Sequence, residues 1–437
     1  MANVKLKRLK IEKYRNVAPG TELVFNDGFN VLLGQNGTGK TTLLRLIATV
    51  LASDFAGLES EEFALEYDLA LSEIDVALSI RNEQQADATE DPDGIARTLS
   101  WSYAVSVKVK AANAAFSLTV TPTGTARDAD EPVAVQAILP PFRSPFNDLF
   151  LILLIRDELL RFEKDLGVAW RQRALGDLFT ARIGGRFDES LGGFDAMIGG
   201  GPRDRENEDR IVSFLFSPKR SKDGSILGGT QLGVPSQVME KIKSEPSILD
   251  QESPKISHLE LDFLQKFTRL AQIQEAYMIL RLTSKSTSSA GTENYLFGEV
   301  TYSFGLNDGS VFKESALSYG QKRLLSFLYH MSLNSHVVIA DELVNGMHYD
   351  WIEACLREIG DRQSFLTSQN PLLLDFLPFA TEQDVEHTFI LCGNEPREGH
   401  RYMVWKNMPE ESAQTFFRSY KTQALQVSEI LRSRGWW

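Results

Sequence analysis

The first part of the chain alternates apolar and polar positions in the way that β-strands require. Residues 5–11 alternate between apolar and basic side chains, and residues 22–25 and 29–33 continue the strand pattern. From Thr41 to Leu51 the apolar positions instead recur at helical spacing. The pattern therefore predicts a strand, a glycine-rich loop that begins at Gly34, and a helix, in that order.

The pattern changes twice further along the chain. It predicts strands over 65–80 and 102–120, and then helices over 146–166 and 170–179. A third helix is predicted over 258–282, whose apolar stripe suits either a core-facing helix or a partner-binding coiled coil.

Strand patterns resume at residue 299, so the chain divides into three predicted segments. Residues 1–145 form a β-rich N-terminal lobe, residues 146–298 a mainly helical insertion, and residues 299–437 a returning α/β lobe.

Composition limits the class of protein. The 437 residues exceed the size at which one hydrophobic core stops growing, and 43% hydrophobic with 24% charged residues is ordinary globular usage. The longest apolar run, residues 149–155, has seven residues where a membrane span needs roughly 20, so no membrane association is expected. Cys355 and Cys392 form no CxxC motif, which predicts a reducing, cytoplasmic setting, no zinc site and two buried thiols.

The loop after the predicted strand carries a complete P-loop pattern. Its residues are Gly34, Gln35, Asn36, Gly37, Thr38, Gly39, Lys40 and Thr41, followed by Thr42 in the predicted helix. The N–H groups of such a loop and of the helix N-terminus hold phosphate oxygens. Lys40 is expected to neutralise the β- and γ-phosphates of ATP, and the Thr41 hydroxyl to bind Mg²⁺. The alternative is a chance glycine-rich turn.

A second chemical motif lies at the end of an apolar strand over 337–340. Asp341 and Glu342 follow that strand directly, as in a Walker B motif. Asp341 is predicted to hold Mg²⁺ through water, and Glu342 to polarise the water that attacks the γ-phosphate. By itself the pair could be a solvated strand end; together with the P-loop it predicts catalysis.

Residues 317–323 read LSYGQKR, just upstream of the Walker B strand. This run resembles the LSGGQ signature of ATP-binding cassette (ABC) ATPases. The resemblance implies that Ser318, Gly320 and Gln321 bind the γ-phosphate held by the P-loop of a second subunit. ATP would then lie inside a head-to-tail homodimer or a higher homo-oligomer. The alternative is an ordinary serine-capped helix.

The long separation of P-loop and signature resembles the RecF, OLD and chromosome-maintenance branch of these ATPases rather than transporter motors. Residues 14–16 are similar to the RecF-type opening, which implies that Arg15 lies near the nucleotide. Residues 138–143 resemble the segment that enters the arm of OLD-like ATPases, and residues 343–348 resemble their D-loop at the subunit interface. The resemblance implies an α/β, ABC-type ATPase head in which a P-loop sheet and a β-rich lobe are interrupted by the helical insertion.

One position departs from that family. Gln369 stands where relatives carry a switch histidine against the γ-phosphate. Glutamine donates a hydrogen bond but carries no charge and relays no proton. We therefore expect hydrolysis to be slow and ATP chiefly to clamp an assembly.

Two functions are carried forward, and both are those of an ATPase without nuclease residues of its own. The first resembles the AriA-type subunit of the PARIS anti-phage system, which controls a separate nuclease effector. The second is a RecF-like repair ATPase that binds duplex DNA. A net charge of −13 disfavours DNA unless a local basic patch exists. The basic residues of 156–186 are interleaved with acids, so an ion-paired surface and a DNA-binding face are the two interpretations.

Overall fold

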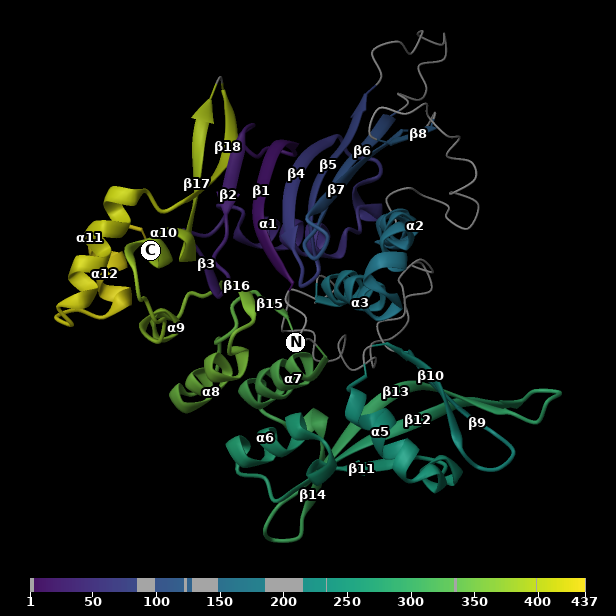
Figure 1. Ribbon diagram of the computed structural model, residues 1–437. Coiled ribbons are helices and arrows are strands. Elements are labelled where there is room, and N and C mark those ends of the chain that lie inside the picture. The colour runs from purple at the N-terminus through teal and green to yellow at the C-terminus, as the bar shows by residue number, and fades with distance from the viewer. Residues whose placement is uncertain are drawn as a thin grey trace, which may run out of the picture. The chain divides into compact units, whose positions relative to one another are not determined.

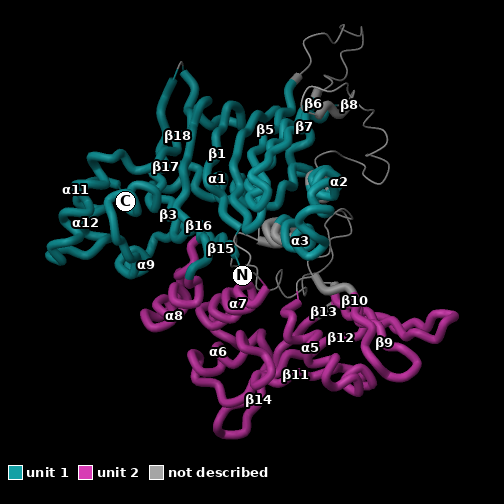
Figure 2. Tube along the Cα trace, in the orientation of Figure 1, with its two compact units in different colours: residues 1–189, 336–341, 361–437 teal, residues 190–335, 342–360 magenta. Residues whose placement is uncertain are grey.

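A computed structural model describes residues 4–84, 99–121, 124–127, 148–184, 215–232, 234–333, 336–397 and 399–436. The predicted arm entry at 138–143 and Arg186 lie outside these residues. The chain forms two compact units (Figure 2): unit 1 comprises 1–189, 336–341 and 361–437, and unit 2 comprises 190–335 and 342–360. The three predicted segments follow the order of the chain, and their borders stay a prediction.

The β-rich lobe of unit 1 is an antiparallel sheet with strand order β2-β1-β4-β5-β6-β7-β8. Its strands are β1 (Lys5–Tyr14), β2 (Thr21–Val24), β4 (Phe63–Ala70), β5 (Ile74–Gln84), β6 (Leu99–Val109), β7 (Ala114–Thr121) and β8 (Gly124–Arg127). Buried and exposed positions alternate along β7, as they do in a sheet with one face on the core. The predicted strand regions over 65–80 and 102–120 are confirmed, each as two strands joined by a turn.

The P-loop sheet of unit 1 has the order β15-β16-β3-β17-β18. Its strands are β3 (Phe29–Leu33), β15 (Val337–Ala340), β16 (Gln363–Thr367), β17 (Phe389–Arg397) and β18 (His400–Asn407). The first four run parallel, and β18 pairs antiparallel with β17. Every residue of β15 and β16 is buried, as expected for a parallel sheet covered on both faces. The carboxyl ends of β3, β15 and β16 therefore meet at one edge, where α/β proteins bind ligands.

Helices complete unit 1. They are α1 (Lys40–Ala52), η1 (Ala56–Leu58), α2 (Asp148–Leu166), α3 (Val168–Gly184), α9 (Pro371–Asp375), α10 (Glu382–Thr388), α11 (Glu410–Lys421) and α12 (Val427–Ser433). Figure 1 shows β17 and β18 as a long hairpin with α10, α11 and α12 beside its base. The predicted helices over 41–51, 146–166 and 170–179 are confirmed. Among the described residues no helix is both long and apolar enough to cross a bilayer.

Unit 2 contains a third sheet, with order β10-β9-β13-β12-β11 and β14 paired to β13. Its strands are β9 (Leu215–Arg220), β10 (Ile226–Leu232), β11 (Lys255–Ser257), β12 (Glu275–Thr287), β13 (Glu293–Gly305) and β14 (Val311–Lys313). The helices of the unit are α5 (Ser236–Ser244), η3 (Pro246–Asp250), η4 (His258–Glu260), α6 (Asp262–Ala271), η5 (Glu314–Ala316), α7 (Tyr319–Leu333) and α8 (Tyr349–Ile359).

This sheet corrects two predictions. The helix expected over 258–282 ends at Ala271, where Gln272 takes the left-handed conformation (φ 56°), and residues 275–287 form β12. From Ala276 to Leu280 buried and less buried positions alternate, and pairing with β13 satisfies that two-residue period. The expectation of a mainly helical insertion is likewise wrong beyond α3, because strands β9 to β13 dominate 215–305.

Candidate functional site

The P-loop lies between β3 and α1, as its pattern predicts. Gly34 has φ 147°, and a Cβ atom placed on it would lie 2.2 Å from the carbonyl oxygen of Cys392 in β17. A side chain at Gly34 would therefore force the loop away from the sheet. Gln35, Asn36 and Gly37 are exposed at the tip of the loop, where phosphate has access to their backbone.

Side chains from β17 and β18 brace the same loop. The Trp405 indole N–H donates to the Thr38 carbonyl at 3.1 Å, and the Asn394 amide donates to the Gly37 carbonyl at 3.2 Å. Thr38 is itself tied back, because its hydroxyl donates to the Gln35 carbonyl at 2.8 Å. The loop is held in its curved form before any ligand binds.

Lys40, Thr41 and Thr42 form the first turn of α1, whose N-cap Gly39 has no side chain that could occupy the helix N-terminus. The Lys40 ammonium donates to the Gly34 carbonyl at 2.8 Å and to the Gln35 carbonyl at 3.1 Å. A compact positive charge thus lies against the loop that would enclose the phosphates.

Three oxygen-bearing side chains meet at the carboxyl edge of the P-loop sheet. The Thr41 hydroxyl donates to one carboxylate oxygen of Asp341 at 2.6 Å, and the Thr367 hydroxyl at the end of β16 donates to the other. Hydroxyl and carboxylate oxygens are the hard ligands that Mg²⁺ requires. Thr41 and Asp341 therefore fit the predicted metal role, and Thr367 fixes the orientation of the carboxylate.

Glu342 directly follows Asp341 and begins the next segment of unit 2. It is a non-glycine residue with φ 51°, a conformation that costs about 1–3 kcal/mol unless surrounding contacts hold it. Its carboxylate accepts a hydrogen bond from the Asn345 amide, and its carbonyl accepts from the Asn345 N–H at 3.1 Å and from Arg323. Such backbone strain at a candidate catalytic residue is typical of active sites.

The signature residues open helix α7 of unit 2. The Gln321 side chain accepts from the Ser318 N–H at 2.9 Å, and the Ser318 hydroxyl accepts from the Gln321 N–H at 3.3 Å. This reciprocal pair is a capping box, so Ser318 does cap helix α7, as the alternative interpretation of the motif states. Gly320 approaches the segment 343–348, predicted to be a D-loop, so closely that a Cβ would lie 2.4 Å from the Gly346 carbonyl oxygen. Binding of a second subunit's nucleotide by Ser318, Gly320 and Gln321 stays a prediction.

Gln369 lies beside the P-loop of unit 1, and the residue after Arg15 is linked to the same loop. The Gln369 amide donates to the Asn36 side-chain oxygen at 3.4 Å, which places it at the tip of the loop. Asn16, the residue after Arg15, is linked to the P-loop through Met403: the Met403 N–H donates to the Asn16 carbonyl at 2.8 Å, and a Cβ on Gly39 would lie 2.2 Å from the Met403 sulfur.

The Arg15 guanidinium itself is engaged with a carboxylate. Its Nε and Nη2 donate to the two oxygens of Glu61 at 2.8 and 2.7 Å. These hydrogen bonds raise the pKa of Arg15 and lower the pKa of Glu61. A role of Arg15 at the nucleotide, which stays a prediction, requires this pair to open.

The basic residues of the α2–α3 region are largely neutralised. Four of them form ion pairs: Arg156 with Asp157, Arg161 with Glu158, Arg171 with Glu163, and Arg173 with Glu73. These contacts favour the ion-paired surface over the DNA-binding face among the arginines whose side chains are described.

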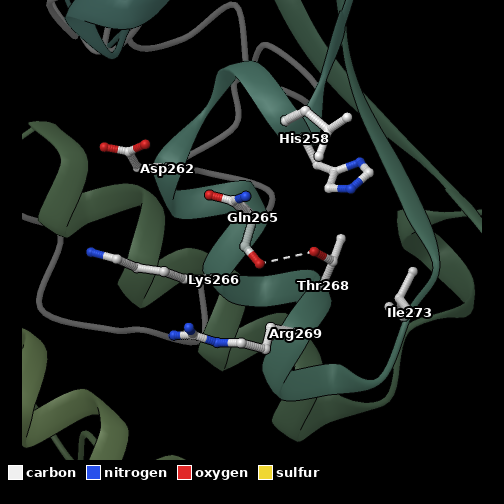
Figure 3. Close-up of a pocket in the computed structure, with 8 residues that line it drawn as sticks. His258, Asp262, Gln265, Lys266, Thr268, Arg269 and Ile273 are labelled. Carbon is white, nitrogen blue, oxygen red and sulfur yellow. Dashed lines mark hydrogen bonds between the residues drawn. The ribbon is translucent and has the colours of Figure 1, made fainter.

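A cavity of about 430 Å³ lies along α6 in unit 2. Figure 3 shows Asp262, Lys266 and Arg269 directed to one side of the helix and His258 and Ile273 lying on the other. The polar groups that line this cavity do not converge on one point (Figure 3).

Sequence reasoning missed three residues that organise the site, namely Thr367, Arg323 and Trp405. Thr367 could have been found from the sequence, because its hydroxyl ends the strand that follows the Walker B strand in the chain. Such a hydroxyl can reach the Walker B carboxylate where the two strands are parallel neighbours. Trp405 gave no local signal, since it reaches the P-loop from 367 residues away.

Comparisons with known proteins agree with this description. A model of an AAA domain matches residues 8–137, which include the P-loop. The DNA replication and repair protein RecF of Enterobacter sp. (strain 638) is 34% identical over 98 residues, covering 20% of this chain and 27% of RecF. The chain thus spans about a quarter of the length of that curated relative.

The solved structures to which the chain is similar have low identity and low TM-scores. An SMC head bound to the C-winged helix domain of ScpA is 11% identical with a TM-score of 0.39, over 92% of this chain and 98% of that one. The SMC head domain from Thermotoga maritima is 11% identical with a TM-score of 0.31, over 93% and 99%. The P-loop sheet, the β-rich lobe and the AAA match together confirm the predicted fold class, an α/β ATPase head of ABC type.

Proposed function

We propose that this chain is a Mg²⁺-dependent ATPase of the RecF and SMC type that completes its active site with a second copy of itself. The observation that carries the proposal is the hydrogen-bonded set Thr41–Asp341–Thr367. It joins the P-loop helix to the ends of two parallel strands, β15 and β16. A carboxylate near a helix N-terminus is favourable by itself. Its pairing with Thr41, the hydroxyl residue directly after the P-loop lysine, is the arrangement that a Mg²⁺-nucleotide complex requires.

The residues of unit 1 would bind ATP. The loop N–H groups and Lys40 would hold the β- and γ-phosphates, and Thr41 with Asp341 would hold Mg²⁺, which neutralises charge between the phosphate oxygens. Gln369, already at the tip of the P-loop, would donate a hydrogen bond to the γ-phosphate without carrying charge.

Glu342 would orient the attacking water and accept its proton as the bond to the γ-phosphorus forms. Because Gln369 relays no proton, the turnover number is expected to be low. The test compares the turnover rates of wild type and Gln369→His with those of histidine-bearing relatives. This explanation of slow turnover is wrong if the wild-type rate already matches theirs and Gln369→His leaves it unchanged.

The second copy would supply Ser318, Gly320 and Gln321. Ser318 is exposed, and the capping box leaves its hydroxyl hydrogen available to donate to an anion. The N-terminus of α7 adds favourable electrostatics for a phosphate. The proposed assembly is a head-to-tail homodimer around ATP.

ATP binding and hydrolysis are tested with Lys40→Ala and the matched control Lys7→Ala, an exposed lysine in β1 of the same unit. Lys40→Ala should abolish Mg²⁺-dependent phosphate release and weaken nucleotide binding, whereas Lys7→Ala should behave as wild type. Intact nucleotide binding by Lys40→Ala would remove the central assignment.

For the cellular role we propose the ATPase subunit of a bacterial anti-phage system, which controls a separate nuclease effector. The net charge of −13 and the paired arginines of α2 and α3 support a protein partner over nucleic acid. The second candidate, a RecF-like ATPase that binds duplex DNA, is supported by the 34% identity with a RecF.

The two roles differ in what an ATP-locked protein retains. Glu342→Gln should hold ATP without hydrolysis, and Glu353→Gln in α8 is its control. Co-purification of a nuclease with the Glu342→Gln protein in ATP supports the anti-phage role. Retention of duplex DNA alone, with steep salt dependence, supports the repair role.

A further inference from the structure

Arg323 is a buried charged residue within unit 2, five positions after Ser318 in helix α7. Only 4% of it is exposed. Its guanidinium donates to the Glu342 carbonyl, to the Leu343 carbonyl at 3.4 Å, and to the Tyr319 hydroxyl at 3.0 Å. One side chain thus contacts both the signature and the backbone of the candidate catalytic glutamate.

The Glu342 backbone needs such a contact. Its left-handed conformation directs the carboxylate, and an L-residue leaves that conformation when nothing holds it. Arg323 and the Asn345 N–H both donate to the Glu342 carbonyl and so fix the peptide plane. A planar guanidinium suits this task because its N–H groups project in fixed directions to several acceptors at once.

Tyr319 connects the contact between Arg323 and Glu342 to the protein surface. The residue is 57% exposed although it is a large aromatic residue in the signature. The ring packs on Gly346, where a Cβ atom would lie 2.8 Å from it, and its hydroxyl accepts from Arg323. Ser318 and Tyr319, the exposed residues of the signature, form what we call the signature face. A molecule that covers this face must therefore cover or displace the residue that also holds Arg323.

We propose that Arg323 is a positioning residue for Glu342 and that Tyr319 links it to occupancy of the signature face. When a second copy covers that face, the Tyr319 hydroxyl fixes the guanidinium, and the guanidinium fixes the Glu342 carboxylate for water activation. This inference rests on the proposed ATPase function for its catalytic consequence, but the placement of Glu342 is measurable without turnover.

The first measurement is hydrogen exchange of residues 342–346 in nucleotide-free protein. Arg323→Lys should raise exchange in this segment at least tenfold and leave helix α8 unchanged, because lysine cannot hold several acceptors in a plane. The control is Arg357→Lys in α8, an exposed arginine paired with Glu353, and it should change neither region. Unchanged exchange in Arg323→Lys would overturn the positioning role, whether or not the protein hydrolyses ATP.

The second measurement is steady-state ATP hydrolysis with nucleotide affinity. Arg323→Lys should lower kcat at least tenfold and leave the Kd for ATP within twofold, and Arg323→Ala should lower kcat further. Tyr319→Phe should lower kcat severalfold in the wild-type background and add nothing in Arg323→Lys, because the two residues act as one unit.

Additive effects of Tyr319→Phe and Arg323→Lys, or equal losses in kcat and ATP affinity, would overturn the link. If wild type shows no turnover while exchange at 342–346 rises as expected, the ATPase proposal fails and the positioning role stands.

Discussion

Gly34 offers a direct test of how tightly the P-loop is seated on its sheet. In Gly34→Ala the new methyl would lie 2.2 Å from the Cys392 carbonyl oxygen and 2.9 Å from the Thr38 hydroxyl. The carbonyl belongs to β17, which pairs with β3, so it cannot swing aside as a side chain could. We expect the substitution to destabilise the native loop conformation by about 1–3 kcal/mol through the unfavourable backbone conformation and by about 1–3 kcal/mol through overpacking.

Gly37→Ala is the matched control. Gly37 lies in the same loop with φ 80°, but a Cβ there meets no atom within 4 Å. Gly37→Ala should therefore be destabilised only by its unfavourable backbone conformation, by about 1–2 kcal/mol. The two variants should therefore differ by roughly 1–3 kcal/mol, which corresponds to roughly 5- to 150-fold in nucleotide affinity if the loop relaxes in the free protein.

The assay is fluorescence anisotropy with a labelled ATP analogue and Mg²⁺, and circular dichroism checks that both variants are folded. Gly34→Ala should bind more weakly than Gly37→Ala by at least fivefold. Equal affinities, or wild-type affinity in Gly34→Ala, would refute the argument that contact with β17 excludes a side chain at this position.

Three further predictions concern charged and nucleophilic groups. Glu61→Gln should free Arg15 and tighten binding of the ATP analogue severalfold, and weaker binding would contradict an Arg15 role at the nucleotide. Hydrogen bonds chiefly from Lys285, then from Tyr295 and Arg220, lower the pKa of Glu293 to about 2. The stability that ionised Glu293 contributes is therefore present above its ordinary pKa of 4.5 and is lost as the pH falls toward 2. Glu293→Gln should reduce the loss of unfolding free energy between pH 4.5 and pH 2. Burial raises the pKa of Cys392 to about 12 and that of Cys355 further; neither thiol should react with a maleimide at pH 7.5 in native protein, and rapid labelling would contradict their burial.

The sequence was sufficient for features whose chemistry is local. The strand, loop and helix around Gly34 depend on neighbouring residues, and so do the apolar strand before Asp341 and the capping box of Ser318 and Gln321. Each is set by backbone hydrogen bonding within a few positions, so its pattern is visible in one stretch of sequence.

Features that depend on distant partners were missed. Residues 263–271 are helical in period, and the apolar residues that follow continued the stripe closely enough to conceal β12. Pairing with β13 along its whole length decides in favour of a strand there. The support of the P-loop by Trp405 is equally invisible, because no local period encodes a contact between separate strands.

The order of strands in the P-loop sheet has a consequence for how the protein is made. Strand β3 lies between β16 and β17, and both follow it by more than 300 residues. At roughly 5–20 residues per second, the ribosome releases these neighbours tens of seconds after β3 has emerged. The antiparallel lobe, made of β1, β2 and β4 to β8, can pair from residues already synthesised, whereas β3, the strand before the P-loop, must wait with both edges open. The nascent chain is therefore most exposed to mispairing at the strand that leads into the P-loop.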